Sequence, residues 1–308
     1  EGIKLYLPRQ HLIEIIKRGK TVINLDATPN ILLTMMFPQT QFTNYEVEEY
    51  LTVTQVTNSL YTKSNIKARN YANLHKLNNA LEVITQNAIF PVLFSHKEFD
   101  PKIESNLDNE KVFSVSNQKT RYGHFDYETR AFNGYSLADV LCIVGHYSHP
   151  ISHLRALAQA VRNSTNRVEK NNPTSVLRPY WYRSQDGSGL GRWLQADPDP
   201  LVQELIKQSE YAIYTQAIGR GRAALRSPEN PLRVYLLTAT PIDSLPVDKL
   251  VRLSDITKTK PNKEKFYARR DELNAQRKQT AYRRVWEAIK RLLAEGKKIT
   301  LDAIEKLS

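Results

Sequence analysis

The chain has 308 residues, and its 44 Lys and Arg against 32 Asp and Glu give a formal net charge of +12. Such an excess of cations favours a polyanionic partner, most often nucleic acid. The single cysteine, Cys142, excludes a disulfide framework and a cysteine-based zinc site. No apolar stretch is long enough to span a bilayer, so we expect a cytoplasmic protein without a membrane partner. The chain begins at Glu1 without a signal peptide, and we expect it to be part of a longer protein.

Strand-like and helix-like segments alternate along most of the chain. Apolar runs predict strands at 21–25, 88–94, 140–144 and 232–237, and alternating β-forming residues predict another at 49–57. Helical spacing predicts helices at 11–19, 71–86, 151–162 and 201–209. This alternation predicts an α/β fold with a parallel sheet flanked by helices.

Residues 164–200 do not continue this pattern, because Asn and Pro clusters and aromatic residues replace the apolar runs. We expect an inserted loop or subdomain there. Its aromatic side chains either stack on the bases of a single strand or hold the insertion together as buried groups; they are Trp181, Tyr182 and Trp193.

The segment from Lys258 onward is crowded with Lys and Arg and almost free of Gly and Pro. It predicts a basic helical tail, in which Arg269 and Arg270 are candidates for nucleic-acid contacts and Trp286 lies on a buried apolar face. A helix, a Gly-Lys-Lys turn and a second helix are typical of the start of a helix-turn-helix or winged-helix unit. The alternative is that these charges are only solvated.

The residues from Tyr211 to Arg226 hold a dense group of functional side chain types. Gln216, Gly219, Arg220, Arg222 and Arg226 follow an apolar lead-in. A guanidinium grips phosphate through two parallel hydrogen bonds, and such an arginine can stabilise the charge that develops in phosphoryl transfer. The alternative is a basic helix on a solvated face.

Polar residues follow several of the predicted strands, at the edge where ligands bind in open α/β sheets. Asp26 and Thr28 could couple a nucleotide site to a nucleic-acid site, or could only cap a turn. A phosphate backbone could contact the loop after the third predicted strand, or that loop could be an ordinary connection; its polar residues are Ser95, His96 and Lys97. Arg130 and Asn133 could contact nucleotide or nucleic acid, unless Arg130 is a structural partner of Glu128 or Asp139.

These motifs resemble, in order, motifs III to VI of superfamily 2 helicases, and within that class iron–sulfur-type and plasmid or viral relatives. The resemblance covers about residues 20–243. It rests on Asp26-Ala-Thr28, Ser95-His-Lys97, Tyr122-Gly123, Arg130, Asn133 and Asp139, and on Gln216-Ala-Ile-Gly-Arg220. One departure is Ala223, which occupies the position where the family's last motif has its second arginine.

The resemblance implies a RecA-like motor domain whose catalytic residues are Gln216, Arg220 and Arg222. It also implies nucleotide contacts by Gly219, Arg130, Asn133 and Asp26, and strand contacts by Thr28, Ser95, His96 and Lys97. The sequence contains no G-x-x-x-x-G-K-[ST] phosphate loop. ATP and Mg²⁺ would therefore be held mainly by a motor domain that lies upstream in the natural protein.

The resulting prediction divides the chain into three parts. Residues 1–45 are the end of the first motor domain or a linker, residues 46–250 are the second RecA-like domain with an insertion at about 164–200, and residues 251–308 are the basic tail. The predicted function is the carboxy-terminal half of an ATP-dependent helicase that acts on single-stranded or forked DNA during replication of a plasmid or virus. The alternative is a non-catalytic DNA-binding or assembly module with a degenerate RecA-like fold.

Overall fold

The computed structural model describes residues 47–101, 111–125, 134–164, 175–185, 189–242, 245–258, 286–287 and 289–290. The chain divides into two compact units, Glu1–Thr257 and Lys258–Ser308. The fold described below belongs to the first unit.

A parallel sheet forms the centre of this unit. In the described part of the chain it has six strands: β1 (Leu51–Val56), β2 (Pro91–Ser95), β3 (Arg121–His124), β4 (Val140–Val144), β7 (Leu232–Leu237) and β8 (Lys249–Val251). Their order across the sheet is β3-β2-β4-β7-β1-β8, and each neighbouring pair is parallel. The predicted α/β fold with a parallel sheet is therefore confirmed.

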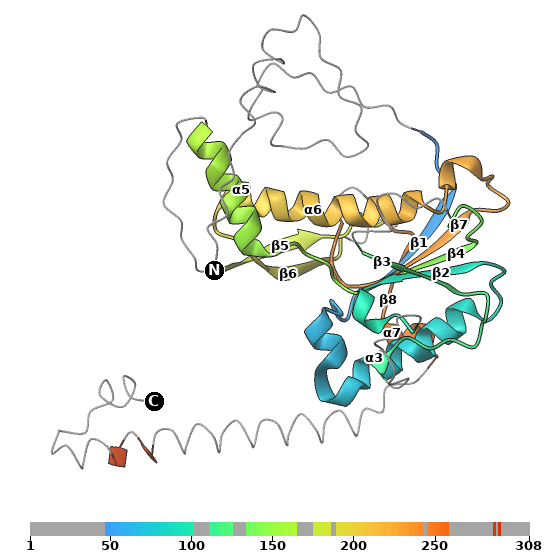
Figure 1. The fold of residues 1–308 in the computed structure, drawn as a ribbon, viewed down its shortest axis with the longest axis horizontal. Coiled ribbons are helices and arrows are strands. Elements are labelled where there is room, and N and C mark those ends of the chain that lie inside the picture. The colour runs from blue at the N-terminus through green and yellow to red at the C-terminus, as the bar shows by residue number, and fades with distance from the viewer. Residues whose placement is uncertain are drawn as a thin grey trace, which may run out of the picture. The chain divides into compact units, whose positions relative to one another are not determined.

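Helices cover both faces of the sheet (Figure 1). Helices α3 (Lys63–Thr85) and α7 (Leu253–Ile256) lie on one face, and α6 (Pro200–Gly219) lies on the other. Helix α5 (Ile151–Ser164) packs against the amino-terminal half of α6. Strand β4 shows why both faces must be covered. Cys142 and Val144 point into the α3 side, whereas Leu141 and Ile143 point into the α6 side, so the strand is an unbroken apolar run.

The predicted insertion contains a second, smaller sheet. Strands β5 (Val176–Trp181) and β6 (Gly191–Ala196) pair antiparallel as a two-stranded ribbon. The ribbon is fixed to the main unit, because the Tyr182 hydroxyl donates to the carbonyl of Ala239 and the Arg192 guanidinium donates to the carbonyl of Thr57. Sequence alone did not predict these strands, since Pro179 and Gly191 interrupt the usual strand pattern.

The strands predicted at 140–144 and 232–237 match β4 and β7. The helix predicted at 201–209 was too short, because α6 continues to Gly219 through the apolar lead-in of the arginine segment. The helix predicted at 71–86 begins earlier, at Lys63, and is kinked where residues 68–71 leave helical geometry. The burial predicted for Trp286 was wrong, since this residue is 60% exposed.

Candidate functional site

Helix α6 carries the predicted catalytic residues at its carboxyl end. The helix starts at the N-cap Asp199, whose carboxylate accepts from the backbone N–H groups of Leu201 and Val202, and Pro200 favours the first helical position. It ends at Gly219, and the Arg220 N–H donates to the carbonyls of Gln216 and Ala217. Gln216 and Arg220 are therefore one turn apart on a well-defined helix end.

Arg226 fixes the loop that follows this helix. Its guanidinium donates to the carbonyls of Gly221 and Ala138, so it joins the loop to the start of β4. Gly221 is equally constrained, because a Cβ at this position would lie 2.4 Å from Cδ2 of Leu232. These contacts make Arg226 a structural residue, and Arg220 and Arg222 remain the arginines that the sequence predicts to bind an anion.

Arg222 is held in an unusual backbone conformation. Its φ of 54° and ψ of 49° are left-handed, and its side chain is exposed. Such a conformation is costly for a residue with a Cβ, and it persists where neighbouring contacts impose it, often at functional sites. Burial lowers the pKa of the Arg220 guanidinium, and the nearby positive charge of Arg222 lowers it further. An anion between these two side chains would reduce that repulsion.

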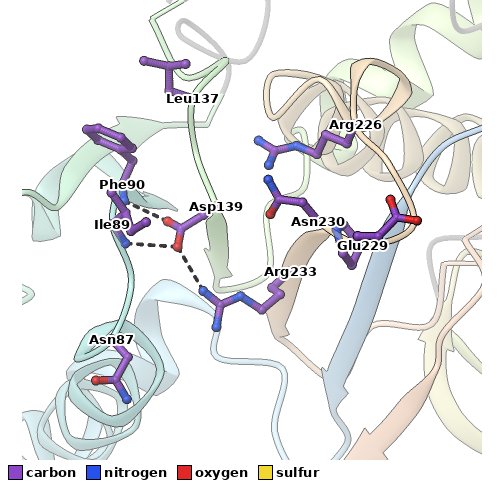
Figure 2. Close-up of a pocket in the computed structure, with 10 residues that line it drawn as sticks. Asn87, Ile89, Phe90, Leu137, Asp139, Arg226, Glu229, Asn230 and Arg233 are labelled. Carbon is purple, nitrogen blue, oxygen red and sulfur yellow. Dashed lines mark hydrogen bonds and ion pairs between the residues drawn. The ribbon is translucent and has the colours of Figure 1, made fainter.

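A hollow of about 530 Å³ opens beside the arginine loop, at the amino ends of β4 and β7 (Figure 2). Arg226 and Arg233 line it together with Asp139 and Glu229. Asp139 accepts from the backbone N–H groups of Ile89 and Phe90 and pairs with Arg233 at 3.0 Å. The carboxylate therefore ties the entry of β2 to β7, which gives Asp139 a structural role.

The loop after β2 lies at the opposite, carboxyl edge of the sheet. Ser95 and His96 are buried at 5% exposure each, whereas Lys97 is exposed. The predicted phosphate contacts of Ser95 and His96 do not fit this burial, because a side chain enclosed by protein cannot reach a backbone phosphate. Burial and the charge of Lys63 lower the pKa of His96 to about 4, so its ring is neutral near pH 7.

A polar network that the sequence did not reveal lies at the same carboxyl edge. His146, just after β4, is hydrogen-bonded through Nδ1 to the Thr240 hydroxyl at 2.7 Å, and its Nε2 lies 3.3 Å from Oε1 of Glu210 on α6. Burial lowers the pKa of His146 to about 4 and raises the pKa of Glu210 to about 8. Near neutral pH the carboxyl group of Glu210 is therefore protonated and the ring of His146 is neutral.

This network joins the loops that follow the central strands. Gln55 on β1 donates to the carbonyls of Thr238 and Thr240, and the Tyr214 hydroxyl of α6 donates to the carbonyl of Gly145. The hydroxyl of Thr240 is enclosed, at 3% exposure of the residue, so it is not available as a nucleophile. The sequence did contain a signal for this network, since His146 and Thr240 lie within three residues of the ends of two strands, β4 and β7.

The structure separates the predicted site residues into two groups. Gln216, Gly219, Arg220 and Arg222 lie near the amino edge of the sheet, where the Tyr50 N–H donates to the Ala223 carbonyl. The second group lies at the carboxyl edge of the sheet, at the end of β2, and consists of Ser95, His96 and Lys97. The remaining predicted residues lie outside the described residues: Asp26, Thr28, Arg130, Asn133, Arg269 and Arg270.

Within the described ranges, no helix is long and apolar enough to cross a membrane. The same ranges contain no group of three or more His, Cys, Asp or Glu side chains that could hold a metal ion. Comparison of the chain with protein-family models, with curated proteins and with solved structures finds no match. Any functional assignment therefore depends on the residues and geometry described above.

Proposed function

We propose that this chain is the second, RecA-like half of an ATP-dependent nucleic-acid helicase and that it supplies arginines to a nucleotide held by another domain. The arrangement at the end of α6 carries the proposal. Arg220 and Arg222 lie close enough to affect each other electrostatically, and Arg226 fixes the loop between them and the sheet. Because this loop is at the amino edge, these arginines are suited to a ligand that binds a neighbouring domain rather than this sheet's own carboxyl edge.

The geometry supports a division of roles within this proposal. Arg222 stands on a strained, exposed turn and would act as the arginine finger, while Arg220 at the helix end would contact a second phosphate oxygen. Gln216, one turn earlier, would orient the attacking water. The space beside Gly219 is open, since a Cβ added at this position would have no atom within 4 Å, so a phosphate group could approach the backbone closely there. ATP with Mg²⁺ supplies the phosphoryl group and the energy for movement along the strand.

The opposite edge of the sheet would face the nucleic acid. Lys97 is the exposed cation of the loop after β2, and the chain's net charge of +12 favours a phosphate polymer. The replication of a plasmid or virus would be the biological setting that the sequence resemblance suggests.

The test requires the natural full-length protein, in which the proposed nucleotide-binding domain is present. We expect Arg222→Ala and Arg220→Ala to reduce kcat for ATP hydrolysis by roughly a thousandfold and to leave affinity for single-stranded DNA within about twofold. Lys119→Ala, which removes an exposed cation elsewhere, is the matched control and should leave both quantities unchanged. The 308-residue chain alone should not turn over ATP.

The same measurements distinguish the second candidate, a DNA-binding or assembly module. If the arginine variants keep normal turnover but lose strand affinity, the arginines belong to a nucleic-acid surface and the motor assignment is wrong. If the full-length protein has neither ATP turnover nor a phosphate loop, the module is favoured, for which the absence of that loop from this sequence is the supporting observation.

A further inference from the structure

The ribbon β5–β6 has two different faces, which its register defines. Tyr180 lies opposite Arg192 on the inner face, where its hydroxyl accepts from the side-chain amide of Gln203 on α6. Ala196, on the same face, is buried at 3% exposure, as is Tyr182 at 6% just beyond the strand. The inner face is therefore packed against the main unit at Tyr180 and Ala196, and the ribbon is held at a fixed orientation.

The outer face is apolar and exposed. The register places Leu177 opposite Gln195, Pro179 opposite Trp193 and Trp181 opposite Gly191. Leu177, Trp181 and Trp193 are 65%, 59% and 65% exposed. The alternative in which the tryptophans are buried to hold the insertion together is therefore wrong, although it holds for Tyr182.

The two indoles are neighbours on this face and are supported from below. Trp193 and Trp181 are a diagonal pair, which separates them by about 7–8 Å. The Trp181 ring lies across Gly191, because a Cβ there would be only 2.6 Å from Cε3 of the indole. A glycine at this position lets the indole rest against the strand, so that its outer face stays open to solvent.

The ribbon is also cationic. The register places Arg178 and Arg192 on the inner face, and the Arg192 guanidinium donates to the carbonyl of Thr57. Arg183, two residues after Trp181, is exposed and is the cation nearest to the indoles in the chain. Exposed indoles with a cation close to them in the chain match the two parts of a single-stranded nucleic acid, whose bases stack on aromatic rings while its phosphates meet cations. A duplex offers only phosphates here, since its bases are already stacked.

We propose that the outer face of the β5–β6 ribbon binds single-stranded nucleic acid, with one base stacked on Trp181 and another on Trp193. This inference rests on the proposed function, because it names where the strand of that function is held. It adds a surface to the Lys97 loop, which lies at the same carboxyl edge that the ribbon contacts through Thr57 and Ala239.

The experiment follows tryptophan fluorescence of the 308-residue chain during titration with oligo(dT). A Trp286→Phe background removes the third tryptophan, so the signal reports on the ribbon alone. We expect quenching on binding. Trp181→Ala and Trp193→Ala, measured by anisotropy of a labelled oligonucleotide, should each weaken binding by roughly 5- to 100-fold. Trp193→Phe should keep most of the affinity, because a phenyl ring still stacks.

Leu225→Ala is the matched control, since Leu225 is 81% exposed at the amino edge and its loss should not change binding. Arg183→Ala should flatten the dependence of log affinity on log salt by about 0.7 units, the value for one phosphate of a single strand. Binding of the same oligonucleotide as a duplex should not respond to the tryptophan changes.

Three results would overturn the inference. The first is single-strand affinity within twofold of the parent in the Trp181→Ala, Trp193→Ala double variant. The second is an equal loss of duplex affinity. The third is sedimentation showing that the tryptophan changes dissolve a dimer instead, which would make the face an interface between two copies. ATP turnover of the full-length protein is measured separately. If Arg222→Ala loses turnover but the tryptophan variants bind single strands normally, the proposed function holds and only the assignment of this surface is wrong.

Discussion

Replacement of Asp199 tests how the arginine-bearing helix is held in place. Asp199 has two tasks, since it caps the amino end of α6 and forms a two-bond pair with Arg162 of α5 at 2.5 and 2.6 Å. The two side chains are only 9% and 5% exposed. The pair is therefore a buried one, for which removal of one partner is far more costly than replacement of both.

The two tasks can be separated by the choice of substitution. Asp199→Asn keeps a capping oxygen but removes the negative charge that faces the buried guanidinium of Arg162, which should cost about 3–5 kcal/mol of unfolding free energy. Asp199→Ala also removes the cap and should cost about 1 kcal/mol more. The double variant Arg162→Met, Asp199→Asn should recover most of the loss, because the buried guanidinium is removed together with the carboxylate.

Urea unfolding followed by circular dichroism at pH 7 measures these differences. Arg162 lowers the pKa of Asp199, so the pair's contribution is present above the ordinary carboxyl pKa and is lost as the pH falls through the folded value. The difference in unfolding free energy between the parent and Asp199→Asn should therefore become smaller at acidic pH. An Asp199→Asn variant within about 0.5 kcal/mol of the parent at pH 7, or a double variant no more stable than the single one, would refute this reasoning.

Three further measurements test other parts of the structure. Gly221→Ala should cost about 1–3 kcal/mol by overpacking, whereas Gly219→Ala, with open space around it, should be neutral or slightly stabilising in the same urea assay. Burial raises the pKa of Glu210 to about 8, so its contribution is lost as the pH rises, and Glu210→Gln should remove a fall in stability on the order of 3 kcal/mol between pH 5 and 9; an unchanged pH profile would contradict the burial of this carboxyl group. Deletion of 258–308 should flatten the salt dependence of DNA binding by several units, and an unchanged slope would mean that the tail's charge does not meet phosphates.

The sequence alone determined the framework of the fold. Val140–Val144 is a continuous apolar run bounded by polar residues, which is typical of a strand buried on both faces. Leu232–Leu237 is interrupted only by Arg233 and Tyr235, at the positions that are half-buried in β7. Their alternation with helical segments predicted the parallel sheet. The sequence also grouped Gln216, Gly219 and Arg220 in one segment, but their place at the end of α6 came from the structure, since the predicted helix ended at residue 209.

Only the tertiary structure decided what the individual polar and aromatic side chains do. Arg226 and Arg222 look alike in the sequence. In the structure the guanidinium of Arg226 donates to the carbonyls of Gly221 and Ala138, whereas Arg222 is exposed. In the same way, the register of the ribbon buries Tyr182 and exposes Trp181. These roles depend on contacts between residues far apart in the chain. Local propensity is set by near neighbours, so it fixes helices and strands but not which side chain meets a distant carbonyl, a distant carboxylate or solvent.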